Sequence, residues 1–153
     1  NSHRGINMPD AISEPMGCYC LGYLWNRGDE VGDATDPNTG RKIEFKATSR
    51  FEGDLSSFGP KCVFDDLVFL RFKLDENLLY IYDLNINSEE FGKYPANKTQ
   101  TIQEQKNQGR RPHVSLQTLF VDANNLEPDI IFDIRRCKAY NRVSEYYQRL
   151  IGK

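Results

Sequence analysis

The sequence lacks the patterns that mark several common classes of protein. Its 153 residues contain no CxxC pair, and its two histidines lie far along the chain from the cysteines Cys18, Cys20, Cys62 and Cys137. A structural zinc site is therefore not expected. No histidine follows closely on Cys18 or Cys20, which disfavours a cysteine nucleophile. GxGxxG and GxxxxGK followed by Ser or Thr are also missing, which disfavours dinucleotide and nucleoside-triphosphate enzymes.

Membrane and export signals are missing as well. No apolar run approaches the roughly 20 residues that a membrane helix needs. We find no secretory signal peptide and no dense cysteine framework, and therefore expect a protein of the reducing cytoplasm with no membrane partner. The first three residues, Asn-Ser-His, include no initiator Met. We interpret them as a cloning remnant or as the cut end of a longer chain.

An excess of basic charge is missing too. Lys and Arg number 20 against 22 Asp and Glu, so the formal net charge is −2. A nucleic-acid role would need local basic patches, helped by a metal that neutralises phosphate charge. Hydrophobic residues make up 39% and aromatic residues 12% of the chain. This composition and length predict one folded domain, residues 1–153.

The N-terminal part of the chain has the spacing of an amphipathic helix. Between residues 9 and 28, apolar residues recur every three to four positions. We expect the helix to begin near Pro9 and to end with Gly28 as its C-cap. Pro15 marks a break or a restart. Glu14, near the beginning of this helix, either faces solvent or leans toward a site.

Three segments read as strands of one sheet. The second is nearly continuously apolar, which is typical of a central strand, and a short polar link to the third predicts a hairpin. These strands are residues 42–48, 65–73 and 78–85.

The second half of the chain continues the alternation of apolar segments and turns. Residues 114–121 predict another strand, whereas residues 128–136 fit either a strand or the start of a helix. Residues 138–151 have an apolar helical face. Together these elements predict an α/β (α+β) fold with a central mixed β-sheet flanked by helices.

The most informative stretch is GDATDPNTGRKIEFKA, residues 32–47. Alternation along the strand places Glu44 and Lys46 on one face and Phe45 on the other. A turn within the stretch brings Asp33 alongside Glu44 if it folds back as a hairpin. Two carboxylates and an amine suit a hard divalent cation held next to a phosphate. Spacing alone leaves a water-exposed strand face as an equal alternative.

Polar segments downstream provide candidate DNA contacts. Gln, Asn and Arg side chains read base edges, and paired arginines grip phosphates. Ser56 and Ser57, in the loop after the strand, are candidate phosphate contacts, with an ordinary surface loop as the alternative. The other candidate DNA contacts lie on a short helix predicted over residues 101–108, which Gly109 closes, and on the segment after it. The alternative for this region is a solvated linker. These candidate contacts are Gln103, Gln105, Asn107, Gln108, Arg110 and Arg111.

Asp33 followed by Ile43-Glu44-Phe45-Lys46 resembles the bipartite PD-(D/E)xK motif of the restriction-endonuclease-like nucleases. The proline of the nominal motif is missing, since Gly32 precedes Asp33. Ser57-Phe58-Gly59-Pro60 and Ile12-Ser13-Glu14 are also similar to small type II restriction endonucleases. The resemblance covers roughly residues 4–121.

The resemblance implies a restriction-endonuclease-like core and a catalytic role for Asp33, Glu44, Lys46 and Glu14. Asp33, Glu44 and the Phe45 carbonyl would hold Mg²⁺, for which Mn²⁺ can substitute. The metal would activate a water molecule, and Lys46 would orient it and offset transition-state charge. The implied partners are double-stranded DNA and a second copy of the chain, because a homodimer matches a palindromic site.

The resemblance thus predicts a Mg²⁺-dependent DNA endonuclease, a type II restriction enzyme that hydrolyses phosphodiester bonds at a short specific site. Two alternatives remain open. One keeps the fold and acts in DNA repair or on junctions. The other is a non-catalytic DNA-binding or interaction module, in which Glu44 and Lys46 are a solvated strand face.

Overall fold

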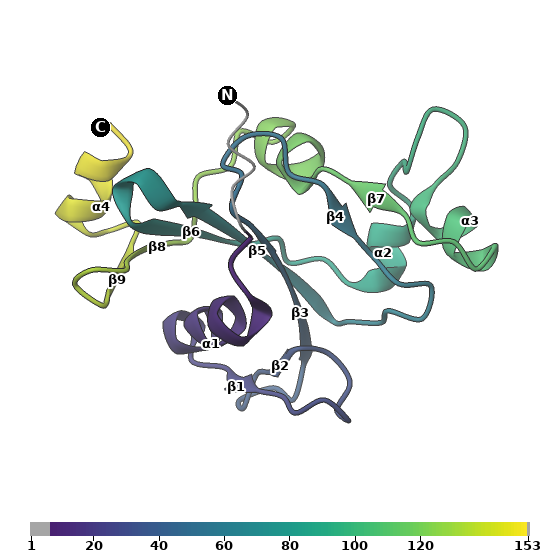
Figure 1. The fold of residues 1–153 in the computed structure, drawn as a ribbon, viewed down its shortest axis with the longest axis horizontal. Coiled ribbons are helices and arrows are strands. Elements are labelled where there is room, and N and C mark those ends of the chain that lie inside the picture. Colours follow the sequence, from purple (N-terminus) through teal and green to yellow (C-terminus); the bar gives the residue numbers. More distant parts are fainter. Residues whose placement is uncertain (1–6, 153) are drawn as a thin grey trace.

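A large mixed sheet forms the centre of the molecule in the computed structural model, which describes residues 7–152 (Figure 1). Within these residues the sheet has seven strands in the order β1-β2-β3-β5-β6-β8-β9. β3 and β5 run parallel, and the other neighbouring pairs are antiparallel. The expected fold class is confirmed. The strands are β1 (Leu24–Trp25), β2 (Ala34–Thr35), β3 (Lys42–Thr48), β5 (Asp66–Lys73), β6 (Leu78–Asp83), β8 (Ile130–Asp133) and β9 (Lys138–Asn141).

The three strands predicted for the middle of the sheet are confirmed. Seven of the eight residues of β5 are buried, as its continuous apolar run predicts. A 3-10 helix, Leu74–Glu76, makes the hairpin to β6, and Asn77 ends it at a φ of 56°. β3 alternates instead, with Ile43 and Phe45 buried and Glu44 and Lys46 partly buried.

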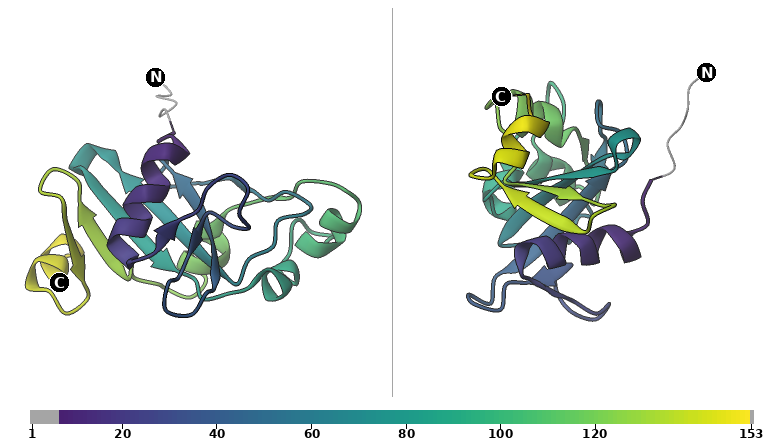
Figure 2. Two further views of the ribbon diagram at one scale, coloured as in Figure 1. Left: turned by 90° about the horizontal axis from the view of Figure 1, so that it is seen from below. Right: turned by 90° about the vertical axis from the view of Figure 1, so that its left-hand side faces the viewer.

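Helix α1 (Asp10–Leu21) lies across one face of the sheet (Figure 2). Its Gly17 packs directly on Phe45, where a Cβ would come within 2.9 Å of the ring. The helix therefore sits close to β3, and a side chain at position 17 would push it away from the strand that carries Glu44 and Lys46.

The predicted end of this helix at Gly28 is wrong. The helix ends at Leu21, because Gly22 adopts a φ of 74° and donates its N–H to the Cys18 carbonyl. This left-handed cap releases the chain into β1. Pro15 does not break the helix, since the carbonyl that it leaves without an N–H partner belongs to Ala11, which is exposed.

The other face of the sheet carries a second core rich in aromatic rings, among them Phe58, Phe91 and Phe120. Figure 1 shows that much of this layer extends to one side of β3. A two-stranded sheet stands there, in which β4 (Ser56–Ser57) pairs with β7 (His113–Val114). The helices of this layer are α2 (Ser88–Gly92), α3 (Ile102–Asn107), a π-helix (Gln117–Asp122) and α4 (Glu145–Leu150).

The predicted helix over residues 101–108 is confirmed, with Thr101 and Glu104 forming a capping box and Gly109 at a φ of 73°. The predicted strand over residues 114–121 is wrong beyond Val114, because the chain turns into the π-helix. The distant Asp54 carboxylate accepts hydrogen bonds from the N–H groups of Leu116 and Gln117 and so fixes the start of this helix.

The C-terminal helix is shorter than predicted. Residues 138–141 form β9 and pair with β8, which also decides the open choice at residues 128–136 in favour of a strand. The helix begins only after Ser144, whose side chain accepts a hydrogen bond from the Tyr147 N–H. No helix among residues 7–152 has the length and apolar character needed to cross a membrane. The three residues interpreted as a remnant lie outside the described residues.

Candidate active site

Glu44 and Lys46 lie side by side on β3. Lys46 Nζ is 3.3 Å from Glu44 Oε1, and the two side chains are 20% and 13% exposed. Lys46 Nζ also lies 4.8 Å from the centre of the Phe58 ring. Phe45 points to the opposite face, into the core beneath α1. The pair is therefore a largely shielded ion pair and not two side chains extended into water.

Asp33, the residue just before β2, reaches β3 across the predicted hairpin. Its N–H donates to the Ile43 carbonyl over 2.8 Å, and its Oδ2 accepts the Phe45 N–H over 2.8 Å. Gly32 stands where the nominal motif has proline. Its φ of 76° is closed to proline, and a Cβ there would come within 3.1 Å of the Ile43 carbonyl oxygen.

Asp36 is held in the turn that makes the hairpin. Its Oδ1 accepts the Asn38 N–H over 2.9 Å, and its carbonyl accepts the Gly40 N–H over 2.8 Å. Asp36 therefore serves the turn, as Asx residues commonly do, and Asp33 is the carboxylate presented to β3.

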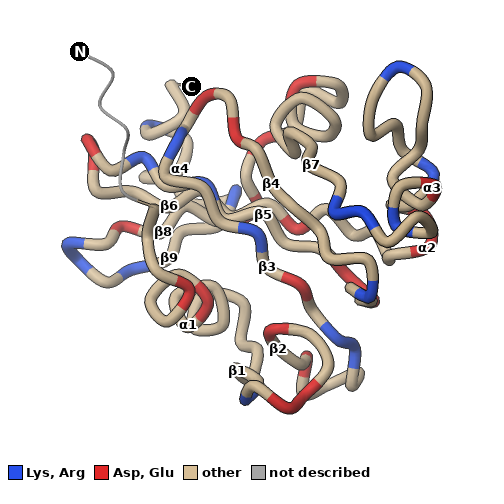
Figure 3. Tube along the Cα trace, turned by 45° about the vertical axis from the view of Figure 1, so that its right-hand side comes forward, with Lys and Arg blue, Asp and Glu red and all other residues tan. Residues whose placement is uncertain are grey.

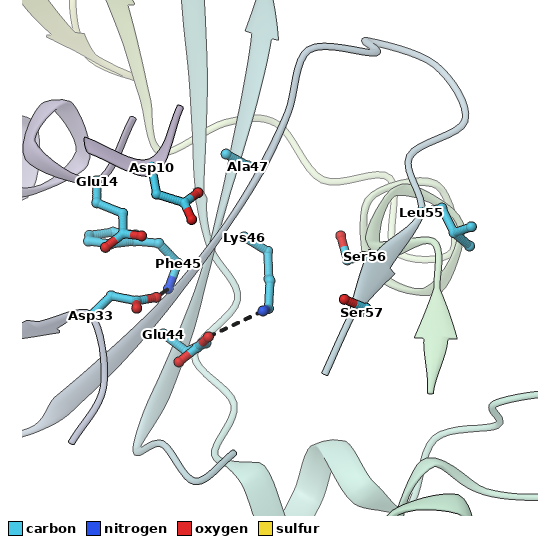
Figure 4. Close-up of a pocket in the computed structure, with 10 residues that line it drawn as sticks. All are labelled: Asp10, Glu14, Asp33, Glu44, Phe45, Lys46, Ala47, Leu55, Ser56 and Ser57. Carbon is cyan, nitrogen blue, oxygen red and sulfur yellow. Dashed lines mark hydrogen bonds and ion pairs between the residues drawn. The ribbon is translucent and has the colours of Figure 1, made fainter. Parts of the chain in front are cut away.

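Asp33, Glu44 and Lys46 line one pocket with a volume of about 220 Å³ (Figure 4). Glu14 enters from α1, and Ser56 and Ser57 face it from β4 on the other side. Asp10 is a lining residue that the sequence analysis did not single out. It lies four residues before Glu14, which places both on one face of a helix. The lining is Asp10, Glu14, Asp33, Glu44, Phe45, Lys46, Ala47, Leu55, Ser56 and Ser57.

Negative charge in this pocket is only partly balanced. Burial, and next the Glu44 carboxylate, raise the pKa of Asp33 to about 7 against the opposing hydrogen bond from the Phe45 N–H. Burial also raises the pKa of Glu14, with smaller contributions from Asp10 and Glu44. Figure 3 shows the acidic positions of α1 beside the acidic and basic positions of β3. Such a site favours a proton or a cation.

Comparison with known proteins gives the family. The sequence model of the Bsp6I restriction endonuclease family matches residues 1–123. The chain belongs to this family. A similar relative is the type II restriction enzyme Bsp6I of Bacillus sp. (strain RFL6), 45% identical over 139 residues, which cover 90% of this chain and 79% of that enzyme. No solved structure matches the chain.

The resemblance to type II restriction endonucleases is thus confirmed at the level of the family. The matched segment of the Bsp6I family contains every candidate site residue, from Glu14 to Arg111. β8, β9 and α4 lie beyond it.

The donor groups at the pocket suit Mg²⁺. The Phe45 N–H points at Asp33, and in an extended strand the N–H and C=O of one residue leave the same edge, so the Phe45 carbonyl faces that side too. The described residues contain no group of three or more His, Cys, Asp or Glu side chains arranged to hold a metal ion. Mg²⁺ keeps several waters, so two carboxylates and a carbonyl oxygen fit it.

The predicted DNA-contact residues separate into two groups. Arg111 donates from Nε to Ser57 Oγ over 3.3 Å, which joins it to the β4 side of the pocket. Basic positions gather on the chain that leads into β7 (Figure 3).

The second group of predicted DNA-contact residues lies on α3 or just after it. In Figure 1 these elements are on the far side of β7 from β3. Among them, Gln105 is only 7% exposed, and Arg110 donates to Gln100 over 3.1 Å. Gln103 donates to Asn107, and Gln108 accepts from Gln100.

Proposed function

We propose that this chain is a Mg²⁺-dependent DNA endonuclease of the type II restriction class, which hydrolyses phosphodiester bonds at a short specific double-stranded site. Membership of the Bsp6I family supports restriction endonuclease activity. The single observation that carries the catalytic assignment is the arrangement of Asp33, Glu44 and Lys46 around Phe45. Two carboxylates and one ammonium group lie within one pocket there.

Asp33, Glu44 and the Phe45 carbonyl would hold the metal, with Mn²⁺ as a substitute for Mg²⁺. When bound, the metal polarises the scissile phosphate and lowers the pKa of a water molecule. The raised pKa of Asp33 supports this role, because a carboxylate that is buried and also lies near Glu44 and Glu14 gains most from a nearby cation.

We assign Lys46 the role of orienting the attacking water and offsetting the negative charge of the phosphate in the transition state. Its ammonium group lies in the pocket beside Glu44, and its contact with the Phe58 ring limits its freedom. A donor held in this way stabilises developing negative charge at little cost in reorganisation. Glu14 would be a further acidic member of the site, contributed by α1.

Ser57 and Arg111 would hold DNA phosphates on the β4 side of the pocket, whereas the buried Ser56 donates its hydroxyl to Asp54 and would support β4. The exposed polar side chains on and after α3, among them Gln103, would contact DNA farther from the cleavage site. We further propose a homodimer, because a two-fold protein matches a palindromic DNA site. The cysteines are free thiols, which suits the reducing cytoplasm.

Digestion of mixed-sequence double-stranded DNA tests the proposal. We expect Mg²⁺-dependent fragments whose mapped ends share one short palindromic sequence. Cleavage at branched or damaged structures without a shared sequence would favour a repair or junction nuclease. DNA that stays intact with Mg²⁺ and with Mn²⁺ would leave a non-catalytic binding module.

A further inference from the structure

A second hollow opens beside the candidate active site. It has a volume of about 380 Å³ and shares Glu14, Asp33 and Glu44 with the first pocket. Its other wall comes from Trp25 on β1 and from the connection that follows to β2, including Arg27. The three carboxylates therefore line two adjoining hollows, and Ser56 and Ser57 line only the first of them.

Trp25 is the only tryptophan of the chain, and 51% of it is exposed. Leu24 on β1 and Val31 on the connection to β2 are 59% and 60% exposed, but of these three apolar residues only Trp25 lines the hollow. The exposed part of the Trp25 ring does not contribute to the packing of this monomer. An exposed indole that lines a polar hollow next to the candidate active site is suited to binding, because every nucleotide offers an apolar face to the ring.

One hydrogen bond orients the indole. Its Nε1–H donates to Glu14 Oε1 over 3.2 Å. Asn26, the next residue, braces the turn: its N–H donates to the Asp33 carbonyl over 2.9 Å, and its Oδ1 accepts the Thr35 hydroxyl over 2.7 Å. A ring that is already oriented loses little conformational entropy on binding, so it adds affinity efficiently.

The neighbouring charges indicate how this wall meets its ligand. Asp29 and Glu30 lie on the same turn as Arg27, and Glu30 accepts the Arg27 N–H over 3.2 Å. Two carboxylates against one guanidinium do not favour a phosphate contact. The apolar ring of Trp25 is therefore the part suited to a sugar or a base.

We propose that Trp25 packs against a DNA nucleotide next to the scissile phosphate, so that β1 and its connection to β2 form one wall of the substrate groove and β4 forms the other. This rests on the proposed function, since it takes DNA as the ligand. A scissile phosphate next to a metal held by Asp33 and Glu44 would have a nucleotide on each side, and the hollow that Trp25 lines adjoins these carboxylates directly. Continuity with the site therefore favours DNA over a second protein as the occupant.

Fluorescence of the single tryptophan tests this directly. A mixed-sequence duplex is titrated with Mg²⁺ into the Lys46→Ala variant, which should bind DNA without cutting it. Saturable quenching or a spectral shift of Trp25 emission is expected. Emission that does not change while DNA binding is seen by anisotropy of a labelled duplex would overturn the proposal.

Cleavage kinetics distinguish two roles for Trp25, namely contact with a nucleotide and positioning of Glu14 alone. In an otherwise wild-type chain, Trp25→Ala should raise KM for DNA about ten-fold with little change in kcat. Trp25→Phe keeps a ring but loses the N–H, and should retain most of the affinity. Equal losses of kcat in both variants, with KM unchanged, would mean that Trp25 only holds Glu14 and would overturn the proposal.

Tyr19→Ala is the matched control, because Tyr19 is a 65% exposed aromatic residue on α1 that lines neither hollow. It should leave KM unchanged. Two results together would instead show a subunit contact: Trp25→Ala sediments more as a monomer than wild type, and Trp25 emission of Lys46→Ala does not change with DNA. The proposal then fails. Quenching by DNA in a chain that cuts nothing would support Trp25 and sink the proposed function alone.

Discussion

The backbone N–H of Phe45 donates to Asp33 Oδ2 over 2.8 Å, although the residues are twelve positions apart. This bond fixes the first carboxylate of the site to the strand that carries Glu44 and Lys46. The bond engages only Oδ2 of Asp33. Burial and the Glu44 carboxylate still disfavour the ionised form of Asp33 and raise its pKa. The predictions for the site follow from this crowding.

Asp33→Asn should abolish cleavage and also remove a pH dependence of stability. The pKa of Asp33 rises on folding from 3.8 to about 7, so the folded state binds the proton more tightly than the unfolded chain. The free energy of unfolding should therefore fall as pH rises from about 4 to about 7, and the variant should lack this contribution. Chemical unfolding at a series of pH values measures it.

Stabilisation of the fold by Mg²⁺ tests the role of Asp33 in a second way that does not depend on cleavage. Above about pH 7 the Asp33 carboxylate is free of its proton, and Mg²⁺ should raise the thermal midpoint of the wild type but not of Asp33→Asn. Asp36→Asn is the control, because Asp36 serves the turn and does not line the pocket. Equal stabilisation of Asp33→Asn and wild type by Mg²⁺ would remove Asp33 from the metal site.

Asp66 should make the stability of the fold fall as pH rises, at a position away from the active site. It is fully buried, and its Oδ1 accepts the N–H groups of Leu67 and Ile86. Its Oδ2 has no hydrogen-bond partner in the described structure, and a proton shared with Asp83 would provide one. Burial, followed by Asp83, raises its pKa from 3.8 to about 8.

The free energy of unfolding should therefore decrease between about pH 4 and about pH 8 through Asp66 as well, because the folded state holds the proton. Asp66→Asn keeps an acceptor for the two N–H groups and supplies a donor toward Asp83, so it should be more stable than wild type near pH 8. Asp75→Asn, at an exposed position, is the control. A variant that loses stability at that pH would contradict the shared proton.

Arg111→Ala should weaken DNA binding at all sequences and lower the slope of log affinity against log salt by about one. The reason is its position, since its guanidinium is held at Ser57 beside the pocket. Arg149→Ala is the control, because Arg149 pairs with Glu145 on α4. An unchanged salt slope for Arg111→Ala would show that no phosphate lies at Arg111.

Asp54→Ala should destabilise the protein by about 2 kcal/mol, since a buried carboxylate that caps a helix is worth roughly this much. Asp54 is 4% exposed and accepts hydrogen bonds from the Ser56 and Ser115 hydroxyls and from two backbone N–H groups. It thereby ties β4 to the π-helix. Urea unfolding measures the loss, and no loss would contradict the role assigned to this network.

The sequence carried enough local information to predict the part of the site built on one hairpin. Strand alternation predicted the shared face of Glu44 and Lys46, and the turn at Asp36 predicted the approach of Asp33. Both predictions depend on neighbours in the sequence, for which spacing is a sound guide. Asp10 was within reach by the same means, because it lies one helical turn before Glu14.

The missed features depend on contacts between distant residues. The π-helix after Val114 depends on Asp54, about sixty positions earlier, and an apolar pattern alone reads the same segment as a strand. The Gly22 cap that ends α1 at Leu21 is local, but the strand after it forms only because β1 pairs with β2. Trp25 likewise reaches Glu14 only through that pairing. Periodicity carries no information on such long-range partners.

The rate of DNA cleavage by Lys46→Ala, compared with that of Lys73→Ala, tests the central claim most directly. Both lysines pair with a glutamate, at 3.3 Å and 3.2 Å, and both lie near a phenylalanine ring, but Lys73 does not line the pocket. Single-turnover cleavage with saturating Mg²⁺ should fall about 100-fold or more for Lys46→Ala and stay near wild type for Lys73→Ala. Equal rates for Lys46→Ala and wild type would contradict the assignment of this pocket as the active site.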